Sequence, residues 1–218
     1  MATTRSTVGD VMTRAAVAIG RDASYKEIVE LMHTWRVGSV PVLEGEGRVV
    51  GVVSEADLLP KEGFREEDVP APSRRAEEAA KAEAVLAEDL MSSPAVTVHA
   101  DATLAEAARI MARRRVKRLP VVNRLGMLEG VVSRSDLLKV FLRSDEEIAE
   151  EIRSAVLAGL PLPERVRFSV VDGVVTLRGP LRHPALPPLL VRAVRAVEGV
   201  VDVREEFSAD PLDPPVDP

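Results

Sequence analysis

The chain has 218 residues, of which 46% are hydrophobic, and it carries a formal net charge of −6 with no cysteine. This length and composition allow a buried core and are sufficient for two domains. The acidic balance argues against a nucleic-acid-binding surface, which would be basic, and the six aromatic residues are too scattered to stack single strands. Without cysteine there is no disulfide, no thiol nucleophile and no Cys-ligated metal site.

The N-terminal segment, Met1 to Asp10, lacks the charged and then apolar pattern of a signal peptide. No apolar run approaches the roughly 20 residues that span a bilayer. We therefore expect a cytoplasmic protein that does not bind membranes.

The chain contains an internal repeat. Residues 10–59 align with residues 89–138 at a constant offset of 79, without a gap, and 20 of the 50 pairs are identical. Two copies of one supersecondary unit commonly stack about a pseudo-two-fold axis, so a cleft between them occurs twice. The repeat therefore indicates where a ligand would bind.

Each copy is predicted to contain a strand, a helix, two strands and a short helix. Ser24-x-x-Glu27 and Thr103-x-x-Glu106 are capping boxes, and each begins a helix with apolar residues at helical spacing. Two apolar strands joined by a Gly-containing turn follow in each copy; they are residues 40–43 and 49–53, and residues 119–122 and 128–132. The pattern predicts a small sheet with helices against it.

A linker, residues 60–86, separates the copies, and residues 144–208 form a third unit without a repeat partner. Ser144 caps its first helix, Asp172-Gly173 turns a hairpin, and Pro187-Pro188 begins a second helix before the last strand. The predicted order is αββαβ. The Asp- and Pro-rich end, residues 209–218, is predicted to be a disordered tail.

Both repeats end in Gly-Val-Val-Ser-x-x-Asp, which places Ser54 and Asp57 in one copy and Ser133 and Asp136 in the other. An ionised carboxylate can accept both hydroxyl hydrogens of a ribose diol, and a helix beginning at the Ser favours phosphate. A structural explanation also fits, because Ser-x-x-Asp before a Leu-Leu pair is close to a capping box. The occurrence of the motif in both copies favours ligand binding over capping alone.

The second copy carries a basic run, residues 113–118, that the first copy lacks. Arg113 to Arg115 end a helix, where cations complement the helix dipole and face water. Lys117 and Arg118 lie beyond that helix, and we predict that they bind phosphate. One short cluster on an acidic chain does not make a nucleic-acid interface.

These motifs resemble the CBS domain, and the tandem resembles the CBS pair, or Bateman module; the resemblance covers residues 7 to about 143. It implies an α+β fold in which two β-α-β-β-α repeats form a pseudo-two-fold module. This module spans residues 1–143 and consists of repeat one (8–59), the linker (60–86) and repeat two (87–143). The resemblance also implies a cleft that binds AMP, ADP, ATP or S-adenosylmethionine. In that family the Asp of the last motif binds the ribose hydroxyls and the Ser binds phosphate. The resemblance therefore implies a ribose-binding role for Asp57 and Asp136 and a phosphate-binding role for Ser54 and Ser133. Two such pairs would associate into a homodimer.

Residues 144–208 resemble the BON domain, through Val171-Asp-Gly-Val-Val-Thr-Leu-x-Gly179 and Val197-x-Gly-Val-x-x-Val203. BON domains are associated with phospholipid surfaces, but this unit has no basic amphipathic helix for an anionic membrane. We expect a docking or ligand-responsive module that contacts an unknown protein partner.

No catalytic or metal-ligating constellation is recognisable, because the three histidines, His33, His99 and His183, lie far apart at no known spacing. The sequence thus predicts a non-enzymatic regulator that senses an adenine nucleotide and passes its state to a partner through the BON unit. The alternative is a scaffold protein that uses the CBS pair for dimerisation without a ligand.

Overall fold

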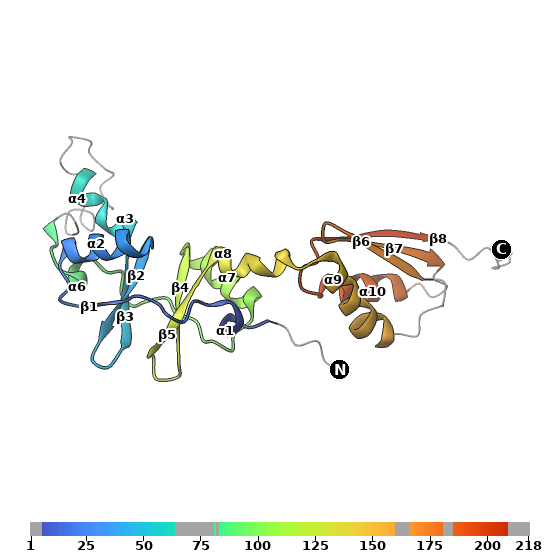
Figure 1. Ribbon diagram of the computed structural model, residues 1–218, viewed down its shortest axis with the longest axis horizontal. Helices are drawn as coiled ribbons and strands as arrows, with labels where there is room; N and C mark the ends of the chain where they lie inside the picture. Colours follow the sequence, from blue (N-terminus) through green and yellow to red (C-terminus); the bar gives the residue numbers. More distant parts are fainter. Residues whose placement is uncertain (1–5, 64–80, 82, 160–165, 181–184, 209–218) are drawn as a thin grey trace. The chain divides into compact units, whose positions relative to one another are not determined.

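The computed structural model describes residues 6–63, 81, 83–159, 166–180 and 185–208 (Figure 1). Contacts divide this part of the chain into two compact units, residues 6–137 and 138–208. Helices and strands occur in both units, which confirms the α+β class. The predicted tail and most of the predicted linker lie outside the described residues.

Repeat one is a three-stranded sheet with a helix against it. The sheet has the order β1 (Ile19–Gly20), β2 (Ser39–Glu44), β3 (Arg48–Ser54); β2 pairs parallel with β1 and antiparallel with β3. The predicted capping box begins α2 (Tyr25–Trp35): the backbone N–H of Ser24 donates to Glu27 at 2.7 Å, and the Glu27 N–H donates back to the hydroxyl at 3.4 Å. Ile28 and Met32 of α2 are buried against the sheet. Two short helices follow β3, namely α3 (Glu55–Leu58) and α4 (Pro60–Gly63).

Repeat two has the same plan with a smaller sheet. After α7 (Leu104–Arg114) come the antiparallel strands β4 (Arg118–Val122) and β5 (Leu128–Ser133), and then α8 (Arg134–Leu137). The strand predicted at the start of this copy is reduced to a single parallel bridge between Val98 and Val121.

The opening segments of the two repeats are exchanged. Helix α1 (Val8–Val11) precedes repeat one but pairs with repeat two, because Val8 N–H donates to the Ala102 carbonyl at 2.9 Å. Helix α6 (Ala87–Leu90) precedes repeat two but pairs with repeat one, because Ala87 N–H donates to the Ala23 carbonyl at 2.9 Å. Leu90 of α6 is fully buried in the core of repeat one. In Figure 1, α6 accordingly lies with α2, and α1 lies with β5.

The second unit has the predicted αββαβ order. It begins with a 3-10 turn, Leu138–Leu142, followed by α9 (Asp145–Glu151), a π-helical turn (Ile152–Val156) and a 3-10 turn (Leu157–Gly159). Its sheet has the order β6 (Arg167–Val171), β7 (Val174–Pro180), β8 (Asp202–Ser208), with β6 antiparallel and β8 parallel to β7. Helix α10 (Leu186–Arg195) buries Leu190 and Val194 in the core of this unit.

The hairpin of the second unit turns where the sequence predicts. Asp172 and Gly173 have φ angles of 50° and 72°, as a type I′ turn requires, and the carboxylate of Asp145 accepts both of their N–H groups at 2.8 Å. The N-terminus of α9 therefore fixes the end of the hairpin.

Among the described residues, no helix is long and apolar enough to cross a membrane.

Candidate functional site

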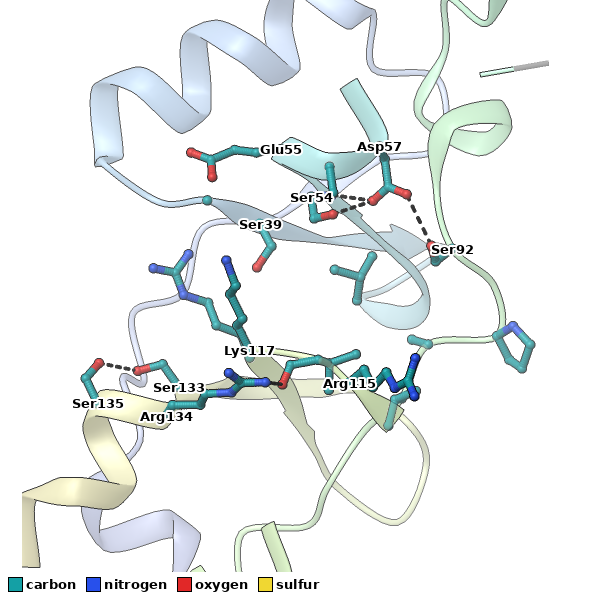
Figure 2. A pocket seen from close by; sticks show the side chains of 18 of the residues that line it. Ser39, Ser54, Glu55, Asp57, Ser92, Arg115, Lys117, Ser133, Arg134 and Ser135 are labelled. Carbon is teal, nitrogen blue, oxygen red and sulfur yellow. Dashed lines mark hydrogen bonds between the residues drawn. The ribbon is translucent and has the colours of Figure 1, made fainter. Parts of the chain in front are cut away.

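A cavity of about 770 Å³ lies between the two repeats, and we call it the inter-repeat cavity. Figure 2 shows Ser39, Ser54 and Asp57 of repeat one on one side and Lys117 and Ser133 of repeat two on the other. Most of its lining consists of residues at equivalent positions of the two copies, which is what a pseudo-two-fold arrangement produces.

Asp57 is the buried carboxylate of the cavity and is only 8% exposed. Its Oδ2 accepts the Ser54 N–H at 2.8 Å and the Ser54 hydroxyl at 2.6 Å. Its Oδ1 accepts the Ser92 hydroxyl at 3.3 Å and forms an ion pair with Lys81. Ser92 reaches this position because α6 and the residues after it belong to repeat one in space, where Ser92 bridges to Val52.

The rest of the cavity is strongly basic. Five cationic side chains line it against two carboxylates, Glu55 and Asp57, a formal excess of three positive charges on a chain whose net charge is −6. The cations are Arg36, Arg115, Lys117, Arg118 and Arg134. Concentrating positive charge in a concave site raises the local concentration of anions.

Four of these cations face the cavity without an internal counter-charge. Within the described residues, the side chains of Arg36, Arg115, Lys117 and Arg118 make no hydrogen bond or ion pair. Arg134 differs, since it donates to the Val116 carbonyl at 3.1 Å. The unpaired cations are therefore available to an anionic ligand.

Arg36 and Arg115 are equivalent residues with an unusual backbone. They end α2 and α7 with φ angles of 52° and 56°, in the left-handed region that non-glycine residues rarely adopt. This conformation turns the chain sharply out of each helix, and both residues line the inter-repeat cavity. The identical Arg-Val pairs at an offset of 79 were the sequence signal for them.

The Ser-x-x-Asp motifs cap helices, as the structural explanation anticipated. In repeat two, the Ser133 N–H and hydroxyl donate to Asp136 Oδ2 at 2.9 and 2.6 Å, matching the bonds around Asp57. Both serine hydroxyls thus donate to carboxylates, so donating to phosphate requires them to rotate. The helices α3 and α8 have four residues each, and their dipoles are correspondingly small.

The structure brings five of the six predicted site residues together. Ser54, Asp57, Ser133, Lys117 and Arg118 line the inter-repeat cavity, whereas Asp136 is not among the described residues that line it. Lys117 and Arg118 therefore share a cavity with the carboxylate of the other copy, and not with that of their own.

The lining also contains polar and charged residues that were not predicted, among them Arg36, Ser92, Arg115 and Arg134. Arg113, Arg114 and Arg115 are all exposed at the end of α7, as expected, and Arg115 also lines the cavity, whereas Arg113 and Arg114 lie outside its lining.

No group of three or more His, Asp or Glu side chains suited to a metal ion occurs among the described residues. His33 is exposed on α2, and His99 is within 2.9 Å of the Val122 carbonyl through Nδ1.

Known proteins resemble this chain over about two thirds of its length. An uncharacterized protein of Methanopyrus kandleri is 30% identical over 146 residues, which is 67% of this chain and 68% of that protein. An uncharacterized protein of Methanocaldococcus jannaschii is 27% identical over 153 residues, 62% of this chain and 90% of that protein. The crystal structure of CBSX2 from Arabidopsis thaliana in complex with AMP is 29% identical, with a TM-score of 0.56, and covers 63% of this chain and 97% of that chain.

Sequence profiles agree with the fold. The CBS domain profile matches residues 8–61 and 87–143, which together make up half of the chain, and the BON domain profile matches residues 144–211. The chain belongs to the CBS-domain family, with two CBS domains followed by a C-terminal BON domain.

Proposed function

We propose that the inter-repeat cavity binds an adenine nucleotide, AMP, ADP or ATP, and that the protein is a non-catalytic regulator. The carrying observation is one cavity of about 770 Å³ that contains both a buried carboxylate and a cluster of unpaired cations. Ligand pockets commonly span about 300–1,000 Å³. A nucleotide has the matching pattern, because its ribose diol donates hydrogen bonds and its phosphates carry negative charge.

The proposed roles follow from the lining. Asp57 accepts the ribose hydroxyls, and Lys117 and Arg118 bind phosphate together with Arg36 and Arg115. AMP in the CBSX2 complex supports this ligand class, since that protein is 29% identical and shares the fold. S-adenosylmethionine remains a candidate, although it carries no phosphate for the basic cluster. For Asp136 we propose the equivalent ribose role at the second, pseudo-symmetric position.

We also propose that nucleotide occupancy changes the state of the BON unit, which contacts a protein partner. Support comes from chain continuity: α8 carries Arg134 and Ser135 of the cavity lining and runs directly into the 3-10 turn Leu138–Leu142. That turn is part of the second unit, where Arg143 donates to Glu151 at 2.6 Å and to the Glu198 carbonyl at 2.8 Å. Nucleotide binding can shift the equilibrium between two arrangements of the second unit only by the difference in binding free energy that the nucleotide has for them.

A homodimer formed through the CBS pair completes the proposal. Val29 and Trp35 on α2 are large apolar side chains that are 41% and 60% exposed, and a dimer contact would cover such surface. Light scattering coupled to size exclusion measures the mass directly. A monomer at all concentrations up to the millimolar range would contradict this part.

Thermal unfolding with a panel of adenosine, AMP, ADP, ATP and S-adenosylmethionine tests the ligand. A ligand at 100 times its dissociation constant adds about 2.7 kcal/mol, which raises Tm by roughly 5–11 °C for a chain of this size. The shift should be strongly reduced in Asp57→Ala. A panel without any shift, together with a dimeric mass, would favour the scaffold alternative, in which the Ser-x-x-Asp motifs only cap helices.

A further inference from the structure

We propose that Lys81, which pairs with Asp57 from outside the cavity lining, competes with the ribose of a nucleotide for that carboxylate, and that its ammonium group leaves Asp57 when a nucleotide binds. Lys81 would therefore set the affinity of the inter-repeat cavity and link it to the segment between the repeats. The inference rests on the proposed nucleotide function and adds an internal competitor to it.

The Asp57 carboxylate accepts four hydrogen bonds. A carboxylate offers about four lone-pair sites. Oδ2 accepts two donors, both from Ser54, and Oδ1 accepts Lys81 and Ser92. Because all the sites are used, each ribose hydroxyl that donates to Asp57 has to displace one existing donor, and the departure of Lys81 frees one site.

Lys81 is the donor best able to leave. The Ser54 N–H is part of the backbone at the start of α3, and its hydroxyl bond is short at 2.6 Å. Ser92 is held by backbone bonds to Val52 in both directions, at 2.9 and 3.2 Å. Lys81 has a long, flexible side chain whose exposed fraction is 22%, so its ammonium group can move into water while its carbon chain stays packed.

The ion pair between Lys81 and Asp57 also contributes to stability. Asp57 is 8% exposed, and a buried carboxylate without a counter-charge is destabilising. A neutral ribose hydroxyl replaces the hydrogen bond of Lys81 but not its charge. Binding of adenosine alone should therefore be weak, and a phosphate bound by the cationic cluster is needed to offset the lost ion pair.

Lys81 has no equivalent lysine at the same offset in the other copy. The residue 79 positions before Lys81 is Ala2, which has no charge and lies outside the described residues. The two copies therefore differ in sequence at this position, although Ser54 and Ser133 make the same hydrogen bonds to the Asp of their own motif.

Calorimetry with adenosine and AMP on Lys81→Ala tests the proposal. Removing one charge-assisted competitor should tighten both ligands by about tenfold, because both carry the same ribose. Lys81→Gln retains a neutral donor, should tighten binding less, and provides a folded variant if the Ala variant is unstable. The matched control is Lys61→Ala, because this lysine donates to the Ala84 carbonyl at 2.7 Å and lies 5.0 Å from the Tyr25 ring centre. Like Lys81 it lies outside the cavity lining, but it does not pair with Asp57.

Unchanged or weaker binding in Lys81→Ala would overturn the competitor. An equal gain in Lys61→Ala would overturn it too, since the effect would then come from loosening the segment and not from freeing Asp57. Absence of binding in the wild type and in every variant would instead refute the nucleotide function itself.

Amine labelling measured by mass spectrometry gives a readout independent of affinity. Saturating AMP should increase the labelling of Lys81, because its ammonium group leaves Asp57 for water, and should leave Lys61 unchanged. Reduced labelling of Lys81 would show that the ligand covers it and would refute displacement.

Discussion

Replacing Lys117 and Arg118 by Ala should weaken ATP binding much more than adenosine binding. Arg118 lies half-buried on β4, so losing its charge-assisted bond to phosphate costs about 1.5 kcal/mol. Lys117 is exposed, and solvent screening reduces its contribution to about 0.5 kcal/mol. The sum of about 2 kcal/mol corresponds to roughly 30-fold weaker ATP binding. Adenosine has no phosphate, and its affinity should stay within about twofold of the wild type.

Isothermal titration at two salt concentrations measures both expectations. Raising the salt from 0.1 to 1 M shortens the screening length from about 10 to about 3 Å, so the wild type should lose ATP affinity and the double variant should lose less. Arg113→Ala with Arg114→Ala is the matched control, because both arginines belong to the same basic run, are exposed at the end of α7 and do not line the cavity.

Two results would refute the reasoning. Equal losses for adenosine and ATP would mean that Lys117 and Arg118 support the start of β4 and not a phosphate. An equal loss of ATP affinity in the control would mean that the general charge of the basic run attracts the nucleotide, without a defined subsite.

Three further predictions concern stability. Gly130→Ala should lower the free energy of unfolding of the first unit by about 1–3 kcal/mol, because a Cβ at this position would lie 2.7 Å from the Thr13 carbonyl oxygen. An unchanged midpoint of urea unfolding would contradict the close packing of the exchanged segment. The pKa of Glu27 lies below its ordinary value of 4.5 because the backbone N–H and the hydroxyl of Ser24 donate to it. The ionised Glu27 therefore stabilises the fold above pH 4.5, and this stabilisation is lost as the pH falls through the lowered pKa. Acid titrations of stability should therefore be flatter in Glu27→Gln, and parallel curves would contradict the cap. Arg143→Ala should cost about 1–3 kcal/mol because its side chain, 27% exposed, bonds Glu151 and a carbonyl. Arg153→Ala removes an ion pair that is more than half exposed and a cation–π contact 5.6 Å from the Phe168 ring centre, and should cost less, about 0.5 kcal/mol; equal costs in the same thermal melts would contradict this ranking.

Local elements were predictable from the sequence because their signals are local. The capping box at Ser24, the turn at Asp172-Gly173 and the αββαβ order all depend on residues within a few positions of one another. The short helices after Ser54 and Ser133 were predictable for the same reason, and the helical turn after Asp136 differs only in becoming 3-10 from Leu138 onward.

The exchange of α1 and α6 could not be predicted, because a repeated pattern does not say which copy a segment packs against. Val8 and Leu90 are apolar residues that would fit either core equally well by type. For the same reason, local patterns did not predict the contacts of Asp57 with Ser92 and Lys81, which lie 35 and 24 positions away in the sequence. Hydrophobic spacing also does not distinguish an α-helix from the π-helical turn at Ile152–Val156.

The exchanged opening segments make each repeat an incomplete folding unit. A fragment containing residues 6–63 alone would carry α1 without its partner and would lack Leu90, which fills its core. The two halves of the first unit should behave as complementary fragments, each poorly folded alone and able to reconstitute the module when mixed. An unpaired third copy added to such a chain would leave one opening segment unmatched, so growth of this architecture by duplication favours even numbers of repeats.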